Sequence, residues 1–273
     1  MKEVILNNGT KIPSIGVGVF RVEDANIAYE TVKTALSVGY RHVDTAMIYG
    51  NEEAVGKAIR DSGIPREEIL LTTKLWNDDQ RSGKVEEAIE ASLKRLGMDY
   101  VNLYLVHWPV KETYVSVWKK MEAVYKSGKA KAIGVSNYQT HHLADLLEEA
   151  EIIPAVNQIE CYPYLSQAAT IQYCLERNIR PEAWGPLGAG KSDILTNPVI
   201  TEIAKKRGLT PAQVVLGWNL ERGVIVIPKS IHKERLTENL KCTDFELTDE
   251  DMTRISALNK NLRLGADPDH FNF

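Results

Sequence analysis

The sequence is poor in cysteine, carries no excess of positive charge and contains no long hydrophobic run. Its three cysteines, Cys161, Cys174 and Cys242, form no CxxC pair, which argues against a disulfide framework or a zinc site and favours a reducing compartment. A formal net charge of −4 provides no overall positive field to attract nucleic acid or an anionic membrane. No stretch reaches the roughly 18 apolar residues of a membrane span. We therefore expect a cytoplasmic protein with no nucleic-acid or membrane partner.

What the sequence does contain is typical of one globular domain. Of its 273 residues, 44% are hydrophobic and 26% are charged, which excludes a disordered or fibrous chain. A (βα)8 barrel needs about 250 residues. Because no linker or low-complexity segment interrupts the chain, we expect a single domain over residues 1–273. No apolar outer patch is evident in the pattern, which favours a monomer.

Six short apolar runs each end on a polar or ionisable residue. The runs are RHVD, LLTTK, NLYLVH, KAIGVSN, AVNQ and VIVIPK, and their β-branched and aromatic residues suit fully buried parallel strands. They end, in order, on Asp44, Lys74, His107, Ser136 with Asn137, Gln158 and Lys229. The intervals from Asp44 to Lys74 and from Lys74 to His107 are close to the roughly 30 residues of one βαβ unit. In a barrel of parallel strands these ends meet in one pocket.

The pattern between these runs predicts an α/β fold, a (βα)8 TIM barrel. Asn8-Gly9 marks the turn of an N-terminal β-hairpin that would plug the bottom of the barrel, before a first strand over residues 15–19. The seventh and eighth strands are predicted at 182–184 and 224–227, with Pro181 at the first position of its strand. Helices are predicted at 24–38, 51–62, 84–96, 115–127, 141–150, 168–177, 198–207, 211–221 and 233–240, with an extra C-terminal helix at 249–258 and a tail.

The residues Asp44, Tyr49, Lys74 and His107 form a set that suits proton donation to a carbonyl group. A tyrosine has a pKa of about 10 in water, and a nearby ammonium group lowers that pKa by stabilising the phenolate. Lys74 can supply the ammonium group, and Asp44 can hold it charged and oriented. His107 can hydrogen-bond a carbonyl oxygen placed beside Tyr49. The set therefore indicates general acid catalysis during carbonyl reduction.

Each of these residues also has an ordinary structural interpretation. Asp44 can be a helix N-cap, Lys74 a solvated strand end, and His107 a hydrogen-bonded structural histidine. Ser136 and Asn137 can form only a capping turn, and Lys229 and Arg235 can lie on a solvated helix face. The other histidines, including His141 and His142, show no shared metal-ligand spacing, so we assign no metal site.

Seven segments of the chain resemble the aldo-keto reductase family. In order they are VDTAMIYGNEEAVG, LLTTKLW, NLYLVHWP, GVSNY, VNQIE, AWGPLG and IPKSIHKERLTEN. The resemblance extends from about Ile5 to Leu258. The short tail is similar to that of bacterial and protozoan members, among them glyoxal reductases, prostaglandin F synthases and 2,5-diketogluconate reductases.

The resemblance implies NADPH-dependent reduction of aldehydes or ketones to alcohols. Tyr49 would donate the proton, Lys74 and Asp44 would tune it, and His107 would orient the carbonyl. The implied cofactor-binding residues are Ser136, Asn137, Gln158, Trp184, Gly185, Leu187, Lys229, Ser230, Arg235, Glu238 and Asn239. Of these, Lys229, Ser230 and Arg235 would hold the 2′-phosphate of NADPH, since charge-assisted bonds to a dianion are strong. An apolar substrate pocket would be lined by Phe20, Ile48, Trp76 and Trp108, for which core packing is the alternative.

The chain departs from the family pattern at Gly185, where a serine usually stands and commonly meets the pyrophosphate. A serine at this position is expected to tighten NADPH binding, unless a positive φ at Gly185 makes a Cβ costly.

Two competing functions remain open from the sequence. Barrels also place reactive lysines at strand ends, so a Schiff-base aldolase using Lys74 or Lys229 is one alternative. The other is a catalytically silent regulatory subunit that binds NADPH.

Overall fold

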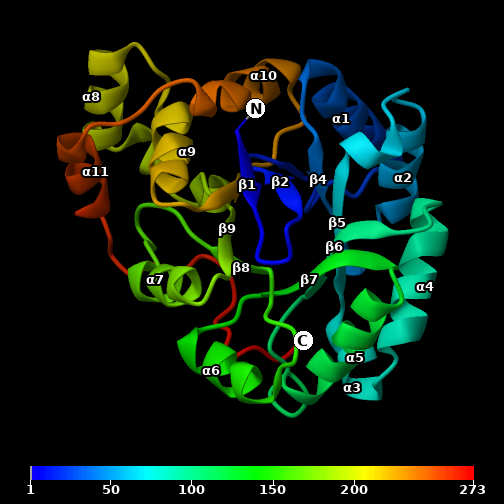
Figure 1. Ribbon diagram of the computed structural model, residues 1–273. Coiled ribbons are helices and arrows are strands. Elements are labelled where there is room, and N and C mark those ends of the chain that lie inside the picture. Colours follow the sequence, from blue (N-terminus) through cyan, green and yellow to red (C-terminus); the bar gives the residue numbers. More distant parts are fainter. Residues whose placement is uncertain (1) are drawn as a thin grey trace.

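The computed structural model describes residues 2–273, and its centre is a barrel of eight parallel strands (Figure 1). Neighbouring strands pair in sequence order from β3 to β10. A bridge between Ile15 and Val226 joins the two edge strands and closes the barrel, as the sequence predicts. The strands are β3 (Val17–Gly18), β4 (His42–Asp44), β5 (Leu70–Leu75), β6 (Val101–Val106), β7 (Ala130–Ser136), β8 (Val156–Glu160), β9 (Arg180–Trp184) and β10 (Ile225–Ile227).

Helices connect the strands and surround the barrel. The α-helices are α1 (Ala25–Val38), α2 (Glu52–Arg60), α3 (Asn77–Ser82), α4 (Val85–Leu96), α5 (Ser116–Lys126), α6 (Thr140–Glu149), α7 (Ala168–Glu176), α8 (Pro198–Arg207), α9 (Pro211–Glu221), α10 (Lys233–Leu240) and α11 (Asp249–Ser256). Short 3-10 helices lie at η1 (Met47–Tyr49), η2 (Arg66–Glu68), η3 (Gly188–Gly190), η4 (Ile194–Thr196) and η5 (Lys241–Thr243).

Local signals mark several helix boundaries. Asp24 accepts a hydrogen bond from the backbone N–H of Ile27 at the start of α1, and Thr210 forms a reciprocal capping box at the start of α9. The sequence predicted α8, α9 and α10 at their observed bounds, whereas α11 ends at Ser256 rather than at 258. The sequence analysis missed α3, because its polar sequence NDDQRS offers no apolar periodicity.

The N-terminal hairpin plugs one end of the barrel, as predicted. Strands β1 (Glu3–Ile5) and β2 (Lys11–Pro13) pair antiparallel and cross the centre of the ring of strands in Figure 1. The hairpin residues Leu6 and Ile12 are buried in one cluster with Leu70 of β5 and Ile225 of β10, each the first residue of its strand. The hairpin therefore closes the amino-terminal end and leaves the carboxyl end for the site.

The prediction that Pro181 occupies the first position of its strand is wrong, because β9 begins at Arg180. The N–H of Arg180 donates to Ala155 of the preceding strand connection at 2.9 Å. Since successive backbone amides of a strand face opposite neighbours, the nitrogen of Pro181 faces the β10 side. The β10 ladder begins one residue later, where Ile225 pairs with Glu182, so the missing donor of Pro181 breaks no ladder bond.

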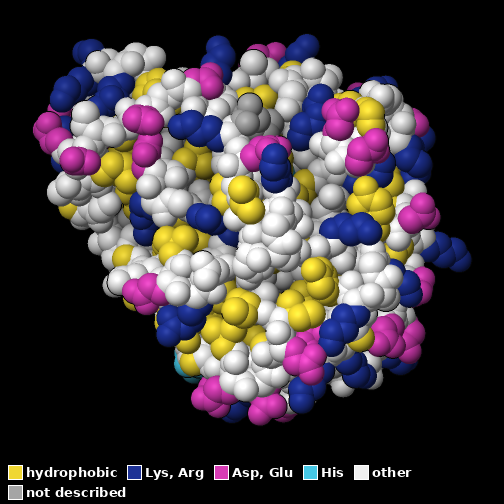
Figure 2. Space-filling view, viewed as in Figure 1, with side chains coloured by type: hydrophobic (Ala, Val, Ile, Leu, Met, Phe, Trp, Pro, Cys, Tyr) yellow, Lys and Arg dark blue, Asp and Glu magenta, His cyan; other side chains and the backbone are white. Residues whose placement is uncertain are grey.

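The described surface is of mixed charge. Lys and Arg side chains are interspersed with Asp and Glu on the face that carries the hairpin (Figure 2). Within residues 2–273, no helix has both the length and the apolar character needed to cross a membrane.

Candidate active site

Four ionisable side chains meet at the carboxyl end of the barrel. Lys74 on β5 is fully buried, and its Nζ donates hydrogen bonds to Asp44 Oδ1 at 2.7 Å, Thr45 O at 2.9 Å and Tyr49 Oη at 3.4 Å. The rings of Tyr49 and His107 meet edge to face, with centroids 5.8 Å apart. The structure thus brings together the four residues that the sequence analysis selected for catalysis.

The environment of Tyr49 favours its protonated form. Burial raises the pKa of Tyr49, and the ammonium group of Lys74 lowers it only in part, so the net pKa lies above the ordinary value. The sequence analysis predicted a lowered pKa, because it included the ammonium group and could not include the burial. For Lys74, burial lowers the pKa, but Asp44 and Tyr49 raise it, and the net pKa is raised. The site therefore pairs a protonated phenol with an ammonium group.

His107 is a neutral imidazole in this environment. Burial holds its pKa well below the ordinary value, and the nearby charge of Lys74 lowers it further. A neutral imidazole carries one N–H, which can donate to a carbonyl oxygen without placing a second cation beside Lys74.

A network of polar side chains continues across the ends of β7, β8 and β9. The hydroxyl of Ser136 donates to the main-chain oxygen of Gln158 at 2.9 Å, and Asn137 Nδ2 donates to the main-chain oxygen of His107 at 3.0 Å. The indole N–H of Trp184 donates to Asn137 Oδ1 at 2.8 Å. Asn137 has a φ of +65°, a conformation that asparagine tolerates better than most residues. These bonds fix four of the predicted cofactor residues beside His107.

The remaining predicted cofactor residues follow β9 and β10. Gly185 and Leu187 come directly after β9, and Ser230 is buried just after β10. Lys229 and Arg235 are exposed, and neither makes an ion pair with any other residue between 2 and 273. This places two unpaired cations close together in the sequence, on either side of the start of α10.

Helix α10 also borders a surface hollow of about 830 Å³. Glu238 lies in its wall, where its carboxylate accepts a hydrogen bond from Thr210 Oγ1 at 2.6 Å, and Asn239 is buried beside it in sequence. Thr210 and Gln213 of the α9 capping box also line the hollow. The hollow is separate from the tetrad of Asp44, Tyr49, Lys74 and His107 and is large enough to take a heterocyclic ring system.

Comparisons with known proteins agree with this geometry. The model of the family described as "Aldo/keto reductase family" matches residues 14–260. The chain belongs to the aldo/keto reductase family. It is 50% identical to a glyoxal reductase of Bacillus subtilis over 270 residues, covering 99% of this chain and 97% of that protein. It is 46% identical to a 9,11-endoperoxide prostaglandin H2 reductase of Trypanosoma cruzi over 269 residues, covering 98% and 95% respectively.

A solved structure has the same fold. The crystal structure of MGS-M4, an aldo-keto reductase from a Medee basin deep-sea metagenome library, superimposes with a TM-score of 0.96 at 47% identity, covering 99% of this chain and 100% of that chain. The present chain is therefore an oxidoreductase, and its barrel is the aldo/keto reductase barrel.

Aromatic side chains pack around Tyr49 and His107 in this enzyme. Phe20 and Ile48 are about half exposed, and the Phe20 ring lies 4.9 Å from the ring of Tyr49. Trp76 packs edge to face on His107 at 5.2 Å, and Trp108 is buried. The structure thus places the predicted pocket residues Phe20 and Trp76 against Tyr49 and His107, respectively.

The tail after α11 contributes two further aromatic rings that the sequence analysis missed. The Phe273 ring stacks on Trp76 at 5.8 Å with an interplanar angle of 6°, and it meets Trp108 edge to face at 5.2 Å. Phe271 packs against Trp108 as well, at 5.2 Å. No local pattern reveals these contacts, because the tail has no regular secondary structure and its partners are more than 150 residues away in the sequence.

Polar contacts hold this tail against the barrel. The fully buried carboxylate of Glu160 accepts hydrogen bonds from the backbone N–H groups of Leu264 at 2.7 Å and Gly265 at 2.9 Å. At the far end, Asn77 and Arg81 of α3 donate to the main-chain oxygen of Phe273 at 3.0 and 2.8 Å. Helix α3, which the sequence pattern did not predict, therefore anchors the ring of Phe273 that packs on Trp76 and Trp108.

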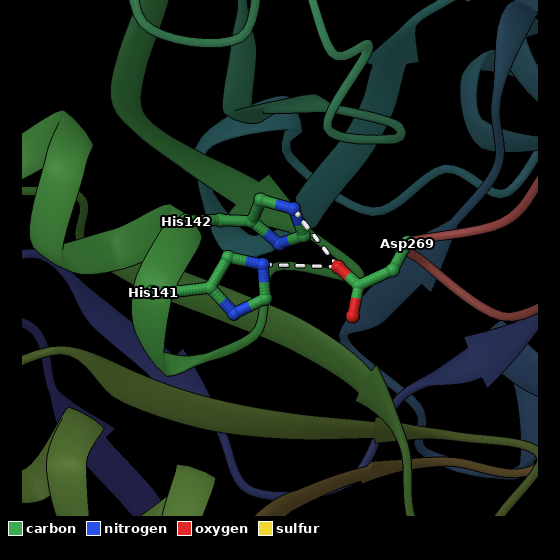
Figure 3. Close-up of side chains that lie close together, drawn as sticks. All are labelled: His141, His142 and Asp269. Carbon is green, nitrogen blue, oxygen red and sulfur yellow. Dashed lines mark ion pairs between the residues drawn. The ribbon is translucent and has the colours of Figure 1, made fainter.

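Asp269 provides a third anchor, at the start of α6. Its Oδ1 lies 2.9 Å from His141 Nε2 and 3.3 Å from His142 Nε2 (Figure 3). Gln139 Nε2 donates to the other carboxylate oxygen at 2.7 Å. His142 Nδ1 accepts the backbone N–H of Gln139, so Nε2 carries the proton and donates to Asp269. A metal ligand needs an unprotonated nitrogen, so this tautomer favours a hydrogen-bonded tether over a metal centre.

The departure at Gly185 has a backbone explanation. Gly185 has a φ of +57°, in the left-handed region that glycine enters without strain. An added Cβ would meet only Ala189 Cβ at 3.7 Å, so the obstacle is conformational and not steric. Because this φ is positive, the strain of an added Cβ opposes the gain in NADPH binding that the sequence predicts for a serine at this position.

We predict that Gly185→Ser lowers the free energy of unfolding by about 1–2 kcal/mol, the cost of the left-handed conformation for a residue with a Cβ. Chemical denaturation measures this cost. Gly185→Ala is the matched control, since it adds the same Cβ without a hydroxyl group. Equal losses in both variants assign the effect to the backbone, whereas an unchanged stability would contradict the strain.

Proposed function

We propose that this enzyme reduces aldehydes or ketones to alcohols with NADPH as the hydride source and Tyr49 as the proton donor. The observation that carries the proposal is the placement of Lys74 Nζ between Asp44 Oδ1 and Tyr49 Oη, at 2.7 and 3.4 Å. An ammonium group held by a carboxylate and directed at a phenol stabilises the phenolate that proton donation leaves behind.

The chain's own residues account for the acid half of the reaction. The reduced nicotinamide supplies a hydride to the carbonyl carbon when it is bound. As the carbonyl π electrons move to the oxygen, that oxygen takes the proton from Tyr49 Oη and becomes the alcohol. The neutral imidazole of His107 donates a hydrogen bond to the same oxygen and orients it. Lys74 stabilises the resulting phenolate, which must regain a proton before the next turnover.

The residues present fit a nicotinamide cofactor. The side-chain oxygen of Gln158 accepts no hydrogen bond from residues 2–273, because its Nε2 faces Asp44 and Glu182, so the oxygen remains available to a carboxamide N–H. Ser136 and Asn137 would bind beside it, and Trp184 would stack on the ring. The unpaired cations Lys229 and Arg235 suit the 2′-phosphate, with Glu238 and Asn239 near the adenine. These assignments support NADPH over NADH.

We further infer that the substrates are small carbonyl compounds such as aldehydes, α-dicarbonyls or keto-sugars. The aromatic rings of Phe20 and Trp76 beside Tyr49 and His107, with Trp108 next to them, support a compact substrate with an apolar face. The relatives named glyoxal reductase and methylglyoxal reductase support the same class. NADPH consumption measured against a panel of these compounds tests the proposal, and a lack of turnover on all of them would contradict it.

We predict that Arg235→Ala weakens NADPH binding about ten- to hundred-fold, the equivalent of one lost charged hydrogen bond of roughly 1.5–3 kcal/mol. NADH binding should change little, because NADH lacks the 2′-phosphate. Fluorescence titration with each cofactor measures both dissociation constants.

Arg254→Ala is a suitable control for the loss of an arginine, since Arg254 lies on α11 and pairs with Glu202. Equal weakening of NADPH and NADH in Arg235→Ala would place Arg235 away from the phosphate.

A further inference from the structure

A second carboxyl group lies beneath the catalytic tetrad, inside the barrel. Glu182 on β9 is fully buried, and its Oε1 accepts a hydrogen bond from Gln158 Nε2 at 2.5 Å. The same nitrogen donates to Asp44 Oδ2 at 2.8 Å. The other oxygen of Glu182 is buried and has no hydrogen-bond partner among residues 2–273. One amide group therefore bridges the carboxyl group of Glu182 to the carboxylate that holds Lys74.

The charges around this bridge do not balance if both carboxyl groups are ionised. Lys74 is the cation in contact with Asp44, and its Nζ already donates to Asp44, Thr45 and Tyr49. The two buried histidines nearby are neutral at working pH, because burial lowers the pKa of His42 to about 4 and that of His107 well below its ordinary value. An ionised Glu182 would be a buried charge without a cation of its own, which is strongly unfavourable.

The amide of Gln158 can take only one orientation between the two carboxyl groups. Its Nε2 has two hydrogens, and each faces a carboxyl oxygen. A flipped amide would place the Gln158 side-chain oxygen against the oxygens of both carboxyl groups. The bridge thus fixes the direction in which the Gln158 oxygen points, and it links the state of Glu182 to Asp44.

We propose that Glu182 is a positioning residue of the catalytic site, which carries a proton in the active enzyme and, through Gln158, sets the charge that Asp44, Lys74 and Tyr49 experience. This proposal rests on the proposed function of the tetrad. Proton donation leaves a phenolate at Tyr49, and a negative charge on Glu182 would disfavour that phenolate. The neutral form of Glu182 is therefore the form that supports reduction.

The groups that face Glu182 determine when it ionises. Burial raises the pKa of Glu182, Asp44 raises it further, and the hydrogen bond from Gln158 and the charge of Lys74 lower it in part, which leaves a pKa of about 8. The neighbouring strand β10 contributes only the apolar residues Ile225, Val226 and Ile227. The carboxyl group of Glu182 thus changes its charge within the pH range in which enzymes are commonly assayed.

The first test is the pH dependence of carbonyl reduction at saturating NADPH in wild type and in Glu182→Gln, which keeps the shape of a protonated carboxyl group and cannot ionise. One pH unit above its pKa only about a tenth of a group remains protonated, so wild-type kcat should fall about tenfold towards pH 9. In Glu182→Gln this fall should be absent. Superimposable profiles would overturn the proposal. Glu122→Gln, which changes a buried carboxyl group outside the site, should keep the wild-type profile.

The second test needs neither cofactor nor turnover, so it separates failure of this proposal from failure of the proposed function. A carboxyl group whose pKa is raised in the folded state binds an extra proton between its unfolded pKa and pH 8, so stability falls as pH rises through that window. Denaturation of wild type should show this fall between about pH 5 and 8 relative to Glu182→Gln. A pH-independent difference between the two proteins would overturn the proposal.

If Glu182→Gln does not fold, wild type alone gives the answer. With glutamate labelled with ¹³C at the side-chain carboxyl, one signal should titrate near pH 8. The absence of any glutamate signal titrating above pH 6 would overturn the proposal.

Discussion

Tyr49→Phe is expected to lower the rate of carbonyl reduction by about 10²–10⁴-fold, the usual contribution of a general acid. The substitution keeps the ring, which packs against Phe20 and His107, and removes only the hydroxyl group that Lys74 contacts. NADPH binding should stay close to that of wild type, since none of the proposed cofactor contacts involves this hydroxyl. Steady-state rates and cofactor fluorescence titration measure the two properties separately.

Tyr104→Phe is a matched control within the same barrel. Tyr104 lies on β6, and its buried hydroxyl has no hydrogen-bond partner among the described residues, so the variant should keep full activity. Turnover of Tyr49→Phe within about threefold of wild type would remove Tyr49 from the role of acid.

The grouping of the proposed catalytic residues could be predicted from the sequence because the fold spaces them periodically. Asp44 and Lys74 lie at the carboxyl ends of β4 and β5, His107 directly follows β6, and parallel strands bring such ends together. Tyr49 follows Asp44 closely enough to share the same loop. Cap residues likewise mark the starts of α8 and α9, where the side chains of Asn197 and Thr210 accept backbone hydrogen bonds and a proline follows each cap.

Other features depend on contacts that no local pattern encodes. The Phe271 and Phe273 rings pack on Trp76 and Trp108 in an irregular segment that Glu160, Gln139 and Arg81 bind by hydrogen bonds. Pairing of distant residues of this kind has no period in the sequence. The polar helix α3 was missed for a related reason. It contributes to the fold by anchoring the tail, and that long-range contact leaves no local pattern in the sequence.

Burial also determines protonation states that the residue types alone do not predict. The sequence analysis predicted a lowered pKa for Tyr49 from its ammonium neighbour, but desolvation of the hydroxyl outweighs that neighbour. Glu182 is the first residue of a predicted strand, and its proximity to Asp44 emerges only from the pairing of Gln158 with Glu182 in adjacent strands. Charge and burial together, and not sequence spacing, determine the protonation states in this site.

Lys74→Met is expected to have the second large effect, on both rate and stability. Methionine fills a similar volume, but the substitution removes the ammonium group that stabilises the Tyr49 phenolate. The apparent pKa of Tyr49 in the pH–rate profile should rise and kcat should fall, because loss of the charge makes the phenol a weaker acid. An unchanged pH–rate profile at a reduced rate would show that Lys74 acts on some other step.

The stability effect separates the structural role of Lys74 from its catalytic role. Removing one member of a buried ion pair costs about 3–5 kcal/mol, since the Asp44 carboxylate remains buried without its cation. The folded-state pKa of Lys74 is raised above its unfolded value, so its stabilising contribution is complete below about pH 10.5 and is lost only above that pH. The loss of stability in Lys74→Met should therefore persist at pH 7.

The double variant Asp44→Asn/Lys74→Met, which leaves no unpaired charge, should recover much of the stability but none of the catalytic rate. Recovery of both would mean that the pair serves the fold alone, and recovery of stability alone assigns the ammonium group to catalysis.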